Sequence, residues 1–240
     1  MESAAFQRLD AQLRRDPVGV DLGVNAATCG LMQRAILVFV KYPEPGRVKT
    51  RLAATLGPDR AAEIYRRLVA EVFARLPGDV EVIVCFDPAE RREDCEKWLA
   101  EKATHFLPQT SGDLGNRLAN AFVVAFARGF AHVAAIGTDC PEIDGFLFAQ
   151  TWTALEKCEV VLGPSKDGGY YLVALREPAA PLFTDIIWSS PDVLSQTLAR
   201  ATAANLRVHL LPKRHDVDTE EDWRQIEPRL LWSTRADLNI

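Results

Sequence analysis

The sequence predicts an α/β protein in which a mostly parallel sheet carries helices on both faces. Apolar, strand-like runs alternate with helical patterns along most of the chain, which is typical of parallel sheets. The clearest run, Ala35–Val40, has no polar alternation, as expected for a strand buried on both faces. No repeat or linker interrupts the pattern, and 240 residues suit one large α/β domain.

The individual elements follow from the spacing of their apolar residues. Helices are expected where large apolar residues recur every three or four positions, as at Leu114, Leu118 and Phe122. Short apolar runs bounded by glycine or proline predict strands. In chain order we expect strand 35–40, helix 58–76, strand 80–86, helix 88–102, strand 104–108, helix 114–126, strand 132–137, helix 143–155, strands 160–164 and 170–175, a helix with Ser190 as N-cap and Pro191 at its first position, strand 206–212 and helix 218–231.

Composition narrows the class of protein. The formal net charge is −5, which argues against a nucleic-acid partner, and the basic residues gather locally instead. Five cysteines without a Cys-x-x-Cys pair argue against a disulfide framework and a structural zinc site, so we expect a cytoplasmic protein. No run of about 18 apolar residues occurs, so no membrane span is expected.

The first 31 residues stand apart from this pattern. They carry charges throughout and lack the apolar core of a signal peptide. One interpretation is an N-terminal arm, residues 1–31, that packs on its own domain or on a second subunit in a homo-oligomer. The other is an upstream start before a true start at Met32. In both cases residues 32–240 are expected to form a single domain.

A basic loop follows the first predicted strand. Its cations are Lys41, Arg47, Lys49 and Arg51, and they lie beside the start of a helix. Such donors can hold a di- or triphosphate. A P-loop is disfavoured because Gly46 is the only glycine there. A solvated basic loop without a ligand is the remaining alternative.

Three aspartates follow other predicted strands. Asp139 follows strand 132–137 with only Thr138 between them, and Asp216 and Asp218 follow the last strand, spaced so that both point to one side of an extended chain. Because ligands in such sheets bind beyond the carboxyl ends of the strands, these carboxylates suit Mg²⁺ or Mn²⁺. Alternatively, Asp139 and Asp218 are helix caps, with Thr219 as a rival cap for the closing helix.

Two glycine-containing loops complete the predicted edge. The stretch "SKDGGYY" contributes Asp167, Gly168, Gly169 and Tyr170, where glycine permits close approach of a ligand or simply makes a hairpin turn. The stretch "QTSGDLGNRL" precedes a helix N-terminus suited to a phosphate or ribose. Its candidate nucleotide-binding residues are Gly112, Asp113 and Arg117, and an ordinary connection is the alternative.

Six segments together resemble a known family. They are "VFVKYPEPGRVKTRLA", "QTSGDLGNRL", "AIGTDCPEI", "GPSKDGGYYLVAL", "IIWSSPDVL" and "DVDTEEDW", in the family's order. The resemblance is to bacterial GT-A-type nucleotide-diphospho-sugar transferases, long described as a domain of unknown function and often called glycosyltransferases. Members in radical-SAM gene neighbourhoods have been associated with arsenosugar biosynthesis. The resemblance covers about Ala35 to Leu230 and implies a GT-A, Rossmann-like fold.

The resemblance also implies roles for site residues. Lys49 and Arg51 would contact phosphates, Asp139 would hold the metal, and Asp216 or Asp218 would supply a second carboxylate. Residues 167–170 would line the acceptor or sugar side. The related 2-phospholactate guanylyltransferase and molybdenum-cofactor nucleotidyltransferases look similar in the basic loop and the central aspartate. The motif "TDC" departs from Asp-x-Asp, which leaves sugar transfer and nucleotidyl transfer both open.

Three functions are therefore carried forward. The first is a metal-dependent glycosyltransferase that uses a nucleotide-diphospho-sugar and a small-molecule acceptor, with Asp139 and Asp167 as catalytic residues. In this scheme Asp167 is the general base. The second is a nucleotidyltransferase that uses an NTP and releases pyrophosphate. The third is a catalytically silent binding module that keeps the fold.

Overall fold

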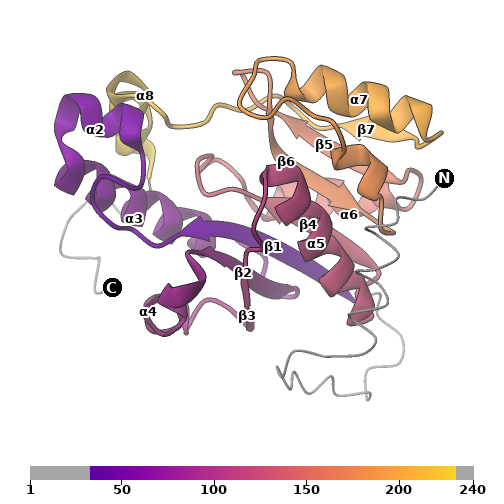
Figure 1. Ribbon diagram of the computed structural model, residues 1–240, viewed down its shortest axis with the longest axis horizontal. Coiled ribbons are helices and arrows are strands. Elements are labelled where there is room, and N and C mark those ends of the chain that lie inside the picture. Colours follow the sequence, from indigo (N-terminus) through magenta and orange to yellow (C-terminus); the bar gives the residue numbers. More distant parts are fainter. Residues whose placement is uncertain (1–32, 231–240) are drawn as a thin grey trace. The chain divides into compact units, whose positions relative to one another are not determined.

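The computed structural model describes residues 33–230 and confirms the α/β class. Seven strands form one sheet, with helices packed on it (Figure 1). The elements are β1 Arg34–Lys41, α2 Thr50–Leu56, α3 Pro58–Ala74, β2 Glu81–Asp87, η1 Ala89–Arg91, α4 Arg92–Leu99, β3 His105–Pro108, α5 Leu114–Ala127, β4 His132–Ile136, α6 Gly145–Leu155, β5 Val160–Pro164, β6 Tyr170–Leu175, η2 Ala180–Phe183, α7 Val193–Ala203, β7 Val208–Leu210, α8 Glu220–Ile226 and η3 Glu227–Arg229.

The order of the strands indicates at which edge of the sheet a ligand would bind. The strands run β3-β2-β1-β4-β6-β5-β7, and β6 alone is antiparallel to its neighbours. The chain moves from β1 to β2 and β3 on one side and returns to β4 on the other, so the order reverses between β1 and β4. Ligands of open α/β sheets bind beyond such a switch point, at the carboxyl ends of the strands.

Helices cover both faces of the sheet, as the sequence predicts. On one face α3, α4 and α6 bury side chains that include Val69, Leu99 and Trp152 against the sheet. On the other face α5, η2 and α7 contribute Phe122, Phe183 and other apolar residues. Because both faces are covered, β4 is buried throughout and β1 is buried from Ala35 to Val38, which explains their lack of polar alternation.

A third apolar cluster ties the end of the described chain to the loop after β1. Leu52 of α2, Ile64 of α3 and Trp223 of α8 are buried together, with Val217 just before α8. In Figure 1 α8 lies beside α2, well away from β7, which precedes it in the chain. This packing brings residues 216–218 back to the basic loop from about 170 positions away.

The helix expected at Ser190 begins later than predicted. Helix α7 starts at Val193 with Asp192 as its N-cap, so the prediction of Ser190 and Pro191 as cap and first residue is wrong. Ser189 has a positive φ of 62°, and Ser190 Oγ donates to the Ile187 carbonyl. The Leu194 amide in the first turn donates to the Gly168 carbonyl of the neighbouring loop. The cap is therefore supplied by tertiary contact.

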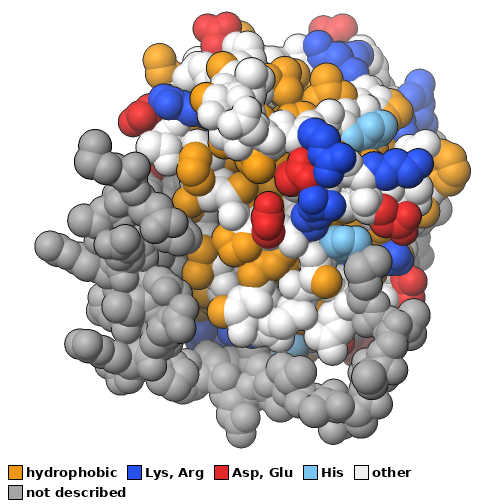
Figure 2. Space-filling view, turned by 90° about the vertical axis from the view of Figure 1, so that its right-hand side faces the viewer, with side chains coloured by type: hydrophobic (Ala, Val, Ile, Leu, Met, Phe, Trp, Pro, Cys, Tyr) orange, Lys and Arg blue, Asp and Glu red, His pale blue; other side chains and the backbone are white. Residues whose placement is uncertain are grey.

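The amino ends of the strands lie at the opposite edge of the sheet. There Glu159 before β5 accepts hydrogen bonds from Arg176 after β6 and from Arg207 before β7. These contacts hold the pKa of Glu159 at about 2, chiefly through the Arg207 guanidinium. Figure 2 shows the face turned away from α2 and α8, where side chains of both charges and histidines lie among one another.

Three predictions concern features beyond the sheet. The arm predicted over residues 1–31 lies outside the described residues, so it and the domain boundary at Met32 remain predictions. Cys29 lies in that part too, whereas Cys85, Cys95, Cys140 and Cys158 are free and buried. Within residues 33–230, no helix has both the length and the apolar character to cross a membrane.

Candidate active site

The loop after β1 presents four cations to one cleft. The cleft has a volume of about 730 Å³, and Lys41, Arg47, Lys49 and Arg51 all line it. Gly46 adopts a φ of 80°, and Arg66 of α3 donates to the Pro43 carbonyl, which fixes the turn. The side chains of Lys41, Arg47 and Arg51 are exposed within the cleft, as an anion site requires.

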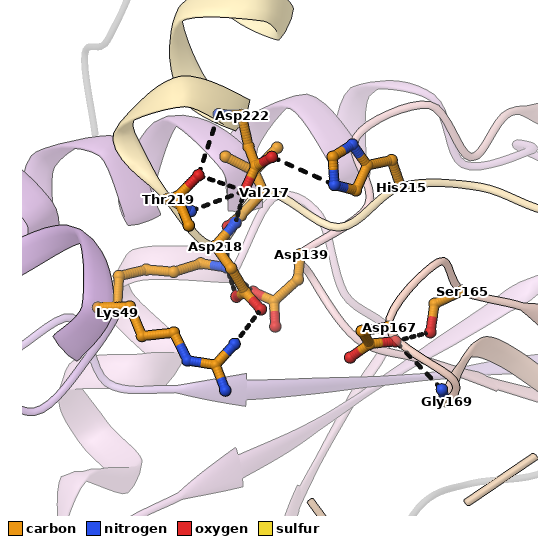
Figure 3. A network of polar contacts seen from close by, with 11 residues as sticks. Lys49, Asp139, Ser165, Asp167, Gly169, His215, Val217, Asp218, Thr219 and Asp222 are labelled. Carbon is orange, nitrogen blue, oxygen red and sulfur yellow. Dashed lines mark hydrogen bonds and ion pairs between the residues drawn. The ribbon is translucent and has the colours of Figure 1, made fainter. Parts of the chain in front are cut away.

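Lys49 differs from the other three cations because its side chain is buried. Its Nζ lies 2.6 Å from Asp139 Oδ1 and 3.4 Å from Asp218 Oδ1, and it donates to the Val217 carbonyl at 2.5 Å. Figure 3 shows its side chain reaching toward both aspartates. Arg51 NH1 contacts the other oxygen of Asp218 at 3.2 Å. The structure thus brings together the basic loop and two of the three aspartates.

Thr219 caps α8, which leaves Asp218 free for the cleft. Thr219 Oγ1 accepts from the Asp222 amide, and Asp222 Oδ2 accepts from the Thr219 amide, so the two form a capping box. Asp222 also accepts from the Asp218 amide and lies 3.2 Å from His215 Nε2 (Figure 3). Asp139 does not cap a helix either, because Asp144 is the N-cap of α6.

Asp216 lies deeper in the same cleft. Burial raises the pKa of this carboxyl to about 7, and the negative charges of Asp139, Asp167 and Asp218 add to the effect. The ammonium of Lys49 opposes the shift. The carboxylates of the site thus carry more negative charge than Lys49 alone can neutralise, which favours binding of a further cation.

The turn of the β5–β6 hairpin lies beside the cleft, and only residues of β6 line it. Asp167 accepts hydrogen bonds from Ser165 Oγ and from the Gly169 amide (Figure 3). Tyr170 lines the cleft, whereas Asp167, Gly168 and Gly169 do not. Asp167 still acts on the site electrostatically, through Asp216. Gly168 has a φ of 92° and packs against Pro191, so the hairpin turn has a structural reason for its glycine.

The loop before α5 and the first turn of that helix also line the cleft. Asp113 caps α5 by accepting from the Asn116 amide, and Gly112 lies at a φ of 107°. Arg117 Nε donates to the Gly112 carbonyl, and its NH1 contacts Gln109 Oε1 at 3.3 Å. All three predicted residues, two in the loop and Arg117 in the first turn of α5, line the cleft.

Sequence reasoning missed two residues of the cleft. Gln109 donates to the Val40 and Cys85 carbonyls and so fixes the orientation of its oxygen toward Arg117. Tyr65 of α3 accepts from the Lys41 amide at the end of β1 and from Thr138 after β4. Gln109 directly follows a predicted strand, a signal that was available, whereas Tyr65 lies within a helical stripe that indicates only core packing.

The carboxylates fit a divalent cation that is shared with a phosphate. Among residues 33–230, no group of three or more acidic, histidine or cysteine side chains forms a complete metal site. Mg²⁺, however, usually takes one or two carboxylates and fills its shell with phosphate oxygens and water. Asp139 and Asp218 supply two such oxygens around one position, where Lys49 now places a positive charge.

Comparisons with known proteins agree with this fold and place the chain in a family. It belongs to the family described as an uncharacterized protein conserved in bacteria (DUF2064), whose model matches residues 69–190. It is 34% identical to a candidate nucleotide-diphospho-sugar transferase from Desulfovibrio desulfuricans, with a TM-score of 0.76. That match covers 87% of this chain and 89% of the other. The predicted resemblance to nucleotide-diphospho-sugar transferases is thereby confirmed.

More distant structures share the fold alone. The 4-diphosphocytidyl-2C-methyl-D-erythritol synthase of Anaerococcus prevotii is 11% identical, with a TM-score of 0.54 over 82% of this chain and 95% of its own. A cytidylyltransferase from Leptospira borgpetersenii is 14% identical, with a TM-score of 0.52 over 82% and 85%. No curated protein matches the chain.

Proposed function

We propose that this protein is a metal-dependent glycosyltransferase that moves a sugar from a nucleotide-diphospho-sugar to a small-molecule acceptor. The observation that carries the proposal is the convergence of Lys49 and Arg51 with Asp139 and Asp218 at the switch point between β1 and β4. Mixed charges of this kind suit a diphosphate shared with a metal ion. The description of the 34% identical relative supports the same donor class.

The cations of the loop after β1 would stabilise the leaving diphosphate. Lys41, Arg47 and Arg51 are exposed in the cleft and would donate to its oxygens as negative charge develops. Such charge stabilisation is commonly the largest catalytic contribution. Asp139 and Asp218 would hold Mg²⁺ or Mn²⁺, with Asp216 behind them. When bound, the ion would supply Lewis-acid stabilisation of the same diphosphate.

The β5–β6 hairpin would serve the acceptor. One carboxylate oxygen of Asp167 is engaged by Ser165 and Gly169, which orients the other oxygen. We propose this second oxygen as the general base for an acceptor hydroxyl. Tyr170, the first residue of β6, lines the cleft, where it would contact the acceptor or the sugar.

Nucleotidyl transfer is the second candidate because of one local observation. Gly137 and Pro141 occupy the positions two residues before and after Asp139, so no Asp-x-Asp pair exists there. The same cations would then stabilise an NTP under attack at its α-phosphate, with pyrophosphate as the leaving group.

The deciding experiment compares donors and products. UDP-, GDP-, ADP- and dTDP-sugars and the corresponding NTPs are screened by thermal shift with and without Mn²⁺, and hits are assayed for transfer. Sugar transfer with release of a nucleoside diphosphate supports the proposal, and pyrophosphate release from an NTP supports the second candidate. Nucleotide binding without metal dependence or turnover would instead revive the silent binding module.

A matched pair of variants tests the metal site. Asp139→Asn should abolish transfer and its metal dependence. Asp79→Asn, an identical change at an exposed turn before β2 on the opposite edge of the sheet, should leave both unchanged. Unaltered, metal-dependent sugar transfer by Asp139→Asn would refute the scheme.

The cellular setting remains part of the proposal. The four described cysteines are free thiols, which supports the expectation of a reducing, cytoplasmic compartment. Homo-oligomerisation through residues 1–31 is proposed from the sequence alone. Size-exclusion chromatography of the full chain and of a variant that begins at Met32 would test it.

A further inference from the structure

Lys49 already fills the cation position between Asp139 and Asp218. Its ammonium group has three hydrogens and three acceptors around it, namely the two carboxylates and the Val217 carbonyl (Figure 3). Only 5% of the side chain is exposed. All three ammonium hydrogens of Lys49 therefore have acceptors within the protein. The other cations of the loop, Lys41, Arg47 and Arg51, are instead exposed in the cleft.

The backbone delivers this ammonium from a constrained position. Lys49 is the N-cap of α2 and has left-handed backbone angles, with φ 46° and ψ 51°. Few non-glycine residues adopt this conformation, and those that do are held there by their surroundings. Here the next turn is anchored by Leu52, which packs with Val217 and Trp223. The same cluster thus fixes both the lysine and the segment that carries Asp218.

This arrangement is incompatible with a metal ion that bridges the two carboxylate oxygens nearest Lys49. A divalent cation bound to Asp139 Oδ1 and Asp218 Oδ1 would lie in the space that the ammonium occupies, and the two positive charges would repel each other strongly. The family resemblance implies that Lys49 contacts a phosphate. It cannot do so while all three of its ammonium hydrogens are engaged by the protein. Both expected roles require Lys49 to leave the carboxylates.

We propose that Lys49 competes with a divalent cation for Asp139 and Asp218, and that the diphosphate of the nucleotide ends this competition by drawing the ammonium onto its own oxygens. The inference rests on the proposed function and deepens it, since it sets the ligand dependence of the metal site. Without nucleotide the protein binds Mn²⁺ weakly, and diphosphate and metal bind with positive coupling.

The competition is tested by binding of Mn²⁺ alone, measured by electron paramagnetic resonance without nucleotide. Lys49→Met removes the charge but keeps an unbranched side chain, and it should bind Mn²⁺ at least tenfold more tightly than the natural protein. Lys49→Arg retains the charge and should stay weak. Lys213→Met removes the same charge at an exposed position shortly before Asp216 and should leave the affinity for Mn²⁺ unchanged. Equal affinity in Lys49→Met and the natural protein would overturn the inference.

A second measurement needs no variant and covers the case in which Lys49→Met does not fold. Acetic anhydride labels accessible amines, and peptide mass spectrometry reports each site. Mn²⁺ near saturation should raise acetylation of Lys49 severalfold relative to Lys213 in the same digest. Unchanged labelling of Lys49 with bound Mn²⁺ would contradict the competition.

The two proposals fail separately. Tighter Mn²⁺ binding by Lys49→Met, together with no transfer from any nucleotide-sugar, would sustain the competition and sink the glycosyltransferase. Sugar transfer, together with an Mn²⁺ affinity that Lys49→Met does not change, would sustain the glycosyltransferase and refute the competition.

Discussion

Gly168 packs directly against the carbonyl group of Pro191. A Cβ atom built on Gly168 would come within 2.6 Å of the Pro191 carbonyl carbon and 2.8 Å of its Cα. In the other direction, the Gly168 carbonyl accepts a hydrogen bond from the Leu194 amide at 2.9 Å. The β5–β6 hairpin and the start of α7 are thus joined by backbone on both sides, with no side chain between them.

This contact predicts that Gly168→Ala is strongly destabilising. The methyl group would collide with backbone that cannot move alone, and alanine would be strained at a φ of 92°. We expect a loss of at least about 2 kcal/mol in the free energy of unfolding, measured by urea denaturation. Gly169→Ala is the matched control, because its nearest neighbour is Ser165 Oγ at 3.2 Å and its φ is not positive. A similar effect of the two substitutions would contradict the interpretation.

The capping box of α8 predicts a second stability effect. Thr219→Ala removes the oxygen that accepts from the Asp222 amide and should cost about 1 kcal/mol. Thr219→Ser keeps this oxygen and should cost less than half as much. Both are compared by urea denaturation. Equal losses would show that the methyl group, rather than the cap, is what matters.

The sequence alone predicts the sheet and its ligand edge well, for a physical reason. Runs such as Ala35–Val40 are buried on both faces, so their apolar character does not depend on which strands are their neighbours. Asp139 and the basic loop follow neighbouring parallel strands, and parallel strands end at one edge. Their placement in one cleft therefore follows from strand direction alone.

The interactions within the site depend on tertiary packing and could not be predicted. Nothing local in the sequence indicates that Lys49 contacts Asp139 and Asp218 instead of lying open to a phosphate. That contact requires α8 to return onto α2, through a cluster that includes Leu52 and Trp223. The late start of α7 has a similar cause, since the carbonyl of Gly168 in another loop accepts from the Leu194 amide and replaces the cap expected from Ser190.

The orientation of Arg117 by Gln109 predicts a coupling between the two residues. Gln109→Met keeps the length of the side chain but loses the oxygen that contacts Arg117 and the donor to the Val40 and Cys85 carbonyls. If Arg117 binds the nucleotide, Gln109→Met should raise the KM for the donor severalfold with a smaller change in kcat. The double variant with Arg117→Met should be little worse than Arg117→Met alone, because both changes remove one interaction. If the two substitutions had additive effects on KM, Gln109 would act independently of Arg117, and the predicted coupling would be wrong.

Asp216 predicts a dependence of stability on pH with a definite sign. Its pKa is about 7 in the folded protein and near 3.8 when unfolded, so the folded state binds the proton more tightly. The stability from this group is fully present below about pH 4 and is lost as the pH rises through 7. Asp216→Asn mimics the protonated acid, and so should be more stable than the natural protein at pH 8, by about 2–4 kcal/mol.

This test depends on the difference in unfolding free energy between Asp216→Asn and the natural protein at each pH, rather than on the pH dependence of either protein alone. Burial lowers the pKa of His105 and His132, and these histidines change stability in the opposite direction over an overlapping range of pH. Both proteins contain them, so subtraction removes their effect. Urea denaturation from pH 5 to pH 8 should show a gap that grows with pH in favour of Asp216→Asn. A constant gap would mean that Asp216 keeps the same charge across this range, and that the cluster with Asp139 and Asp218 does not hold its proton.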